Sequence, residues 1–371
     1  MLDRLPPELV DHILDLLPSP AKLDGVHERT IALRACCVVS KALRDRAESL
    51  LWRDVAILRW DQADRALLRF KDANNETKER LSGTRSLRLG VEDQLFHVDE
   101  TFDILAFSPG LRELRLECQG DLDMSLLANS VSNLEILALN RSITLRSSAS
   151  FVFPYLTNLS LNRTDLLPSF ATNIFATFTS ALPSLRALAI SPNHEPTEPH
   201  IYEILFDAKS PAFLGRRSTL DMLQLHLKDI TEFSKPVFYS EVPTVITVTN
   251  NSLASQRMRE LLSECAPSHV RYYHSPSAPT RLDIFAEGLM RLLLLVHVPS
   301  RPKSLHVPSC LRPEPSERIA EPQDALFAAC ERKGVEVVWY DLEEEDEREV
   351  SPSFWRYAMG IKAEKEKEET R

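Results

Sequence analysis

Leucines recur along the middle of the chain in a short, fixed pattern. The spacing L-x-x-L-x-L, with Ile at one final position, occurs at 111–116, 134–139, 156–161, 185–190 and 220–225, and a shorter copy occupies 86–89. Consecutive copies end at positions 116, 139, 161, 190 and 225, which lie 22 to 35 residues apart. Apolar residues at alternate positions are typical of strands, so each copy predicts a strand. Weaker copies at 54–57, 245–248, 270–273, 304–307 and 335–340 predict further strands.

Segments with helical spacing of apolar residues lie between several of these strands. They include 61–70, 170–182 and 252–265. One short strand and one helix in each interval resembles the leucine-rich-repeat arrangement. The resemblance implies an α/β fold, an irregular solenoid in which parallel strands form a horseshoe with helices outside. An ordinary α/β domain with a buried parallel sheet is the alternative, because its strands are hydrophobic as well.

The first fifty or so residues carry a helical pattern instead. Residues 5–17 follow helical spacing, and Pro6 and Pro7 suit a helix start, where the missing N–H is not needed. A second helix is predicted from about 30 to 52. Such a short module has little interior in which to bury its apolar side chains. We therefore expect it to dock on a partner or on the rest of the chain.

This module resembles an F-box domain of the fungal type. The resemblance rests on LPPEL at 5–9, IL and LL within 13–17, ACCVVSKALR at 35–44 and ESLLWRDVAI at 48–57. In that family the region binds a Skp-type adaptor, which links it to a cullin–RING ubiquitin ligase. The residues here that match the adaptor-binding positions are Leu5, Pro6, Glu8, Leu9, Ile13, Leu16, Leu33, Cys36, Val39, Leu43 and Trp52. Two features depart from the family pattern: the segment from Ser19 to Arg29 is longer than usual, and Leu43 stands where many members have Trp. An N-terminal helical cap that packs on the rest of the chain is the alternative.

The two resemblances together imply three parts: an F-box domain at 1–58, a repeat region at 59–340 and an acidic, charged tail at 341–371. They imply the substrate-recognition subunit of a Skp–cullin–F-box ubiquitin ligase, which catalyses no reaction itself and needs no cofactor. Its partners would be the adaptor, the ligase and a protein target. The alternative is a leucine-rich-repeat interaction scaffold that acts outside a ubiquitin ligase.

In each strand, the residues that alternate with the leucines point to the opposite face, which is the concave face of a horseshoe. We expect the target to contact this face. The residues chosen, hereafter the predicted target face, are Arg88, Arg115, Ala138, Ser160, Ala189 and Gln224. Arg88 and Arg115 hold matching positions in neighbouring copies, where both guanidinium groups can face one acidic or phosphorylated segment. The alternative is local pairing, for instance with Glu113 or Glu117.

Composition narrows the function classes. The 9 glycines never lie closer than seven positions apart, which excludes the glycine-rich phosphate-binding loops. The net charge of −10 disfavours binding of nucleic acid through its phosphates. The 56 leucines agree with a leucine-dense architecture.

The sequence contains no complete catalytic or metal-binding motif of the common kinds. Neither HExxH nor GxSxG occurs, and Cys265, His269 and His274 have loosely ligand-like spacing without a fourth ligand. None of the six cysteines forms CxxC, which favours a reducing compartment. The most apolar run, 289–298, spans ten residues, whereas a membrane span needs about 20, and the N-terminus does not look like a signal peptide. We therefore expect a protein of the cytoplasm or nucleus, away from membranes.

Overall fold

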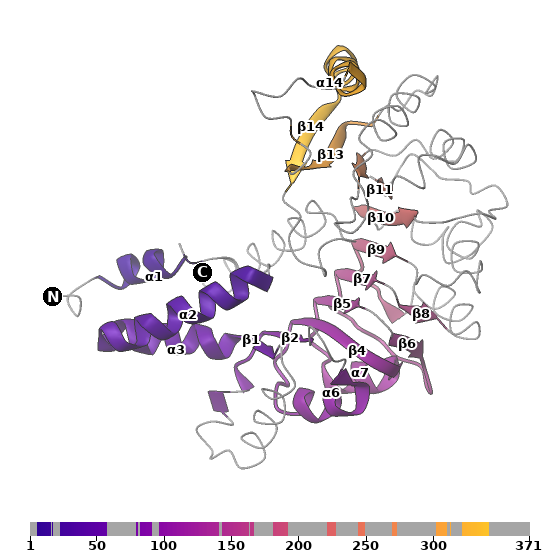
Figure 1. Cartoon of the computed structure of the whole chain (residues 1–371). Coiled ribbons are helices and arrows are strands. Elements are labelled where there is room, and N and C mark those ends of the chain that lie inside the picture. The colour runs from indigo at the N-terminus through magenta and orange to yellow at the C-terminus, as the bar shows by residue number, and fades with distance from the viewer. Residues whose placement is uncertain are drawn as a thin grey trace. The chain divides into compact units, whose positions relative to one another are not determined.

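The structure is a computed structural model, and the chain has a mixed α/β fold in which parallel strands form a sheet (Figure 1). The structure describes residues 6–15, 17, 23–57, 79–80, 82–90, 96–140, 143–162, 164–166, 181–191, 221–227, 244–248, 269–272, 302–309, 312 and 321–340. The chain divides into two compact units. The first comprises Met1–Leu159, Arg163–Asp165 and Ala181–Ser184, and the second comprises Ser160–Asn162, Leu166–Ser180 and Leu185–Arg371.

The first unit begins with three helices, α1 (Pro7–Asp15), α2 (Leu23–Val39) and α3 (Lys41–Arg53). The helix predicted over about 30–52 is thus divided in two. The division lies at Ser40, which is extended with φ −154° and ψ 161° and whose Oγ accepts a hydrogen bond from the Leu43 N–H at 3.2 Å. A serine in this position caps a new helix. Helices α2 and α3 pack side by side (Figure 1).

The strands of the first unit follow directly. They are β1 (Asp54–Ile57), β2 (Ser86–Leu89), β4 (Glu113–Asp123), β5 (Ile136–Asn140) and the start of β7 (Asn158–Asn162), and they neighbour one another in that order. The short strands β3 (Phe96–His97) and β6 (Ile143–Arg146) pair with β4, while β8 is Asp165–Leu166. Two further helices, α6 (Val98–Leu105) and α7 (Met124–Ser130), lie between strands in the sequence.

Buried leucines of neighbouring strands lie beside one another in rows. Leu87 lies opposite Leu114, and Leu114 lies opposite Leu137, in parallel register. In the second unit, Leu188 lies opposite Leu223 in the same way. All five side chains are buried. The short leucine period therefore places matching residues of neighbouring strands beside one another, and their contact forms the core.

The second unit continues the parallel arrangement. Its later strands are β9 (Ala187–Ser191), β10 (Met222–Leu227), β11 (Thr244–Val248), β12 (His269–Tyr272), β13 (Ser304–Pro308) and β14 (Glu336–Tyr340), each pairing in parallel with the next. The weak copies in the sequence are thus strands. Helix α14 (Glu321–Lys333) contacts β14 through the rings of Phe327 and Trp339, whose centroids are 5.5 Å apart. The predicted helices 61–70 and 252–265, most of 170–182 and the tail 341–371 lie outside the described residues.

Candidate functional site: the helical module and its junction with the sheet

The helical module has a core of its own. Val10 and Leu14 of α1 pack with Leu33 of α2 and with Leu43 and Ala47 of α3, and all five are buried. Four-residue spacing within one helix brings each pair to the same face. Two residues predicted to contact an adaptor, Leu33 and Leu43, therefore lie inside the module.

Other predicted adaptor residues are exposed. Leu9 is 49% exposed, Ile13 40% and Val39 52%, and we call these three side chains the exposed apolar residues of the module. Pro6 and Glu8 are exposed as well, whereas Cys36 and Trp52 are partly buried. Leu5 and Leu16 lie outside the described residues. Helix α1 is thus apolar on two sides, because Val10 and Leu14 face the core while Leu9 and Ile13 face outward.

The module continues into the sheet without a break. Strand β1 starts at Asp54, directly after α3, and pairs with β2. The Trp52 carbonyl accepts a hydrogen bond from Thr84 Oγ1 at 2.9 Å, and the Arg53 carbonyl accepts one from the Arg85 N–H at 2.9 Å. The backbone of Trp52 therefore contacts the segment just before β2. The resemblance to an adaptor-binding module does not imply this contact.

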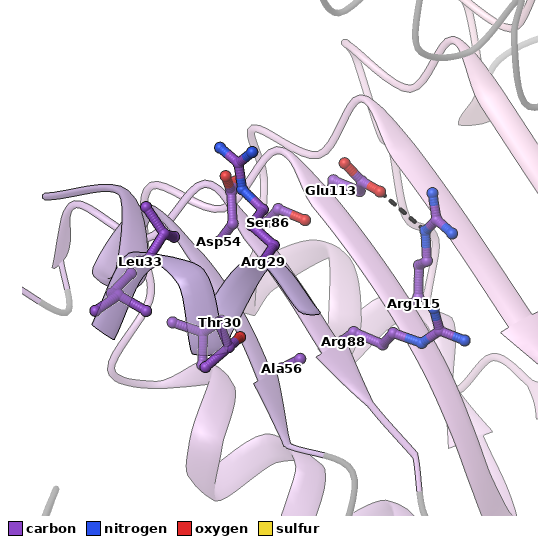
Figure 2. A pocket seen from close by; sticks show the side chains of 11 residues that line it. Arg29, Thr30, Leu33, Asp54, Ala56, Ser86, Arg88, Glu113 and Arg115 are labelled. Carbon is purple, nitrogen blue, oxygen red and sulfur yellow. Dashed lines mark hydrogen bonds and ion pairs between the residues drawn. The ribbon is translucent and has the colours of Figure 1, made fainter. Parts of the chain in front are cut away.

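Helix α2 also lies against the sheet, beside the arginines of the predicted target face. Arg29, Thr30 and Leu33 of α2 line a small cavity with Arg88 and with seven other residues, Leu51, Asp54, Val55, Ala56, Ser86, Glu113 and Arg115 (Figure 2). The cavity volume is about 20 Å³. Pockets for small molecules have about 300–1,000 Å³, and one water needs about 10–15 Å³. The junction between α2 and the first strands is therefore a packed contact with room for solvent and not for a metabolite.

Arg115 is paired within its own strand. Its Nε donates to Glu113 Oε1 at 2.9 Å, and both side chains are buried (Figure 2). Arg88 lies opposite Arg115 in register and is 8% exposed. Arg115 therefore pairs locally with Glu113, as in the alternative, but the pair is buried and not solvated. Both arginines line the same cavity as Arg29, Thr30 and Leu33 of α2, a long-range proximity that the repeat pattern does not encode.

The rest of the predicted target face is buried too. Ala138, Ser160, Ala189 and Gln224 are each at most 2% exposed. We expected an open strand face here, as leucine-rich repeats have. Burial of both faces is instead typical of parallel sheets.

One polar cluster was not found from the sequence. Ser304 of β13 lies between His269 of β12 and His306 of β13, within hydrogen-bond distance of both rings. His269 had been noted only beside Cys265 and His274, and these last two lie outside the described residues. The cluster could be predicted only from the parallel register of β12 and β13, in which His269 lies opposite Ser304.

The two buried cysteines among those described, Cys118 and Cys330, are poor candidates for a reactive thiol. Cys36, Cys37, Cys118 and Cys330 form no disulfide in the part of the chain that the structure covers. Burial raises the pKa of Cys118 to about 12 and that of Cys330 to about 11. A thiol needs a lowered pKa to act as a nucleophile near neutral pH.

Within the ranges described above, no group of three or more His, Cys, Asp or Glu side chains is placed to hold a metal ion. No helix in these ranges has the length and apolar character needed to cross a bilayer. No protein-family model and no curated protein matches this chain.

Proposed function

We propose that this chain is the substrate-recognition subunit of a Skp–cullin–F-box ubiquitin ligase. Its N-terminal helices would form the F-box and bind a Skp-type adaptor. The observation that carries the proposal is the pair of faces on α1, where Val10 and Leu14 complete a core while Leu9 and Ile13 stay exposed. Val39 at the end of α2 is half-exposed as well. Apolar side chains that fold into no core of their own are the kind that a partner covers.

The parallel strands support the second half of the proposal, a leucine-rich-repeat region that holds a protein target. Leucines in register from β2 to β5, and again between β9 and β10, are what stacked repeats place in their interior. The chain would carry out no chemical step. It would raise the effective concentration of the target beside the ubiquitin-transferring enzymes.

The arginines take a different role in this proposal from the one that the sequence predicted. Arg88 and Arg115 are buried and line the cavity beside α2, and in this proposal they stabilise the junction between the helical module and the first strands. The target would contact the remaining residues of the predicted target face, which are Ala138, Ser160, Ala189 and Gln224. Because these residues are buried, the face must first be uncovered.

Affinity purification from the native host, followed by mass spectrometry, tests the proposal. A Skp-type adaptor together with a cullin supports the ligase subunit. An adaptor without a cullin, after cross-linking, supports the alternative, a repeat scaffold outside a ligase. Recovery of neither overturns the F-box assignment.

A further inference from the structure

A buried hydrogen-bonded chain links two strands of the second unit. Ser304 Oγ lies 2.7 Å from His269 Nδ1 and 2.8 Å from His306 Nε2. The two imidazole rings meet edge to face with centroids 6.0 Å apart. Ser304 and His306 are 4% and 3% exposed, and His269 is partly buried. One hydroxyl thus connects β12 to β13 through two titratable rings.

The two hydrogen bonds at Ser304 are compatible with neutral rings. A serine hydroxyl has one hydrogen to donate and lone pairs with which to accept. When both rings are neutral, Ser304 donates to one ring nitrogen and accepts the N–H of the other. If both rings are protonated, each facing nitrogen carries a hydrogen, and the serine must accept twice and turn its own hydrogen elsewhere. Protonation therefore keeps both ring–serine contacts but takes away the ring acceptor of the Ser304 hydrogen in a nearly dry place, where a donor without an acceptor is costly.

The charges around the chain oppose its protonation. Arg271 of β12 lies opposite His306 in register, is 1% exposed and stacks on the Tyr340 ring, with its guanidinium carbon 4.8 Å from the ring centroid. Tyr340 is held in turn, because its hydroxyl donates to the Tyr272 carbonyl at 2.6 Å. A second cation on His306 would lie beside the Arg271 guanidinium with little water to screen the repulsion.

Two further charged neighbours among the described residues lie at the edge of the cluster. Lys303 precedes β13, and Glu336 of β14 lies opposite Ser304, both exposed. Val245 of β11 lies opposite His269 and carries no charge. Helix α14 packs on Trp339, whose neighbour Val338 lies opposite His306, so by strand alternation α14 faces the other side of the sheet. Burial lowers the pKa of His269, Lys303 lowers it further, and Glu336 acts in the opposite direction.

We propose that His269, Ser304 and His306 form an acid-sensitive clasp, which ties β12 to β13 while both rings are neutral and releases this pairing when they take up protons. The clasp is independent of the proposed ligase function, since it uses only contacts within the second unit. It adds a conformational response to acidification at the C-terminal end of the sheet.

The direction of the pH effect follows from linkage. Where β12 and β13 have separated, the imidazoles titrate near the ordinary pKa of 6.5, whereas the closed clasp keeps His269 neutral to a lower pH. The open state then binds more protons below 6.5, so its population rises as the pH falls. Each proton taken up only in the open state changes the opening equilibrium by about tenfold per pH unit.

Hydrogen exchange of the whole chain, followed by mass spectrometry at pH 7.5, 6.5 and 5.5, tests the clasp. Protection factors, corrected for the intrinsic pH dependence of exchange, should be constant above 6.5 for peptides that cover β12 and β13. By pH 5.5 they should fall, with about a hundredfold as the upper limit for two protons bound only in the open state. His269→Asn should reduce this fall, and His12→Asn, at an exposed histidine of α1, should leave it unchanged. Unchanged protection in the wild type from pH 7.5 to 5.5 overturns the proposal.

A second measurement keeps the test decisive if His269→Asn does not fold. The imidazole C–H resonances of the wild-type chain, labelled with 13C-histidine, report each ring's charge directly. The clasp requires two rings that are neutral at pH 7.5 and protonate only below 6.5, together with loss of β12 and β13 protection at the same pH. Ser304→Ala provides the assignment, because removal of the shared hydroxyl shifts both resonances and lowers protection at pH 7.5. A charged ring at pH 7.5 that responds to Ser304→Ala contradicts the clasp.

Discussion

Arg115 Nε lies 2.9 Å from Glu113 Oε1, and both residues belong to strand β4 with side chains at most 7% exposed. Two residues apart on one strand, they share a face, and α2 lines the same cavity. The pair thus stands between the helical module and the sheet.

Breaking this pair should destabilise the first unit. Glu113→Ala leaves the Arg115 guanidinium without its buried counter-ion, and we expect a loss of about 3–5 kcal/mol in the free energy of unfolding. The double variant Glu113→Leu, Arg115→Met removes both charges and should lose much less, because apolar replacement of a buried pair is often neutral. Urea denaturation followed by circular dichroism measures both. Equal losses in the single and double variants would contradict the role given to the pair.

The leucine row gives a second prediction. Leu137 is fully buried and lies opposite Leu114, so Leu137→Ala leaves a cavity between strands and should cost about 2–5 kcal/mol. Leu126 of α7 is 51% exposed, and Leu126→Ala should change stability by less than about 0.5 kcal/mol. Both variants make the same Leu→Ala change, one at a buried strand position and one at an exposed helix position, and thermal unfolding compares them. Similar melting temperatures would mean that the row does not form the core.

The sequence predicts the strands better than the contacts between distant parts. The leucine spacing predicts strands at 111–116, 134–139 and 185–190, and β4, β5 and β9 overlap these ranges, because a period of two within a few residues is enough to indicate a strand. Ser40 was missed as a helix boundary, since apolar residues continue on both of its sides and only its cap geometry separates α2 from α3. Arg88 is buried and lines a cavity with Arg29, Thr30 and Leu33 of α2, which are far away in the sequence, so the repeat pattern alone could not predict these surroundings.

We expect acid to destabilise α7, because Asp123 caps this helix. Its Oδ1 accepts hydrogen bonds from Ser125 N at 2.9 Å and Ser125 Oγ at 2.5 Å, and Ser148 N lies at 3.5 Å. Although burial acts to raise the pKa of Asp123, these hydrogen bonds outweigh it and lower the pKa from 3.8 to about 2. A lowered pKa means that the stabilisation is complete above 3.8 and is lost as the pH falls through about 2.

Two substitutions of Asp123 distinguish the contribution of its hydrogen bonds from that of its charge. Asp123→Ala should cost about 0.5–2 kcal/mol at neutral pH, as loss of a helix cap does. Asp123→Asn keeps an acceptor at the cap and should cost less, while the acid-dependent part of the loss disappears. Denaturation curves at pH 7, 4 and 2.5 measure this. If the alanine variant is as stable as the wild type at pH 7, the Asp123 cap does not stabilise α7.

The exposed apolar residues of the helical module allow a matched test of adaptor binding. Leu9 in α1 and Leu126 in α7 are almost equally exposed, at 49% and 51%. Leu9→Glu places a charge where the proposed adaptor would exclude water, and it should reduce capture by a purified Skp-type adaptor at least tenfold. Leu126→Glu should leave capture unchanged, and neither variant should alter the circular dichroism spectrum. If both variants bind the adaptor like the wild type, α1 does not contact it.

The last prediction concerns access to the predicted target face. Ser160 is 1% exposed, whereas Val152 is 50% exposed in the segment before the same strand. Cysteine nearly matches serine in shape, so Ser160→Cys should fold and present a thiol at the face without disturbing it. We expect a maleimide to modify Val152→Cys at least a hundredfold faster than Ser160→Cys, with the modified peptides identified by mass spectrometry. Fast labelling of Ser160→Cys in the chain alone would mean that the face is open. A target could then contact the face directly, without a prior conformational change that uncovers it. If labelling of Ser160→Cys becomes fast only when a captured target is added, the target opens the face from a neighbouring surface, and the buried residues Ala189 and Gln224 become the next sites for the same substitution.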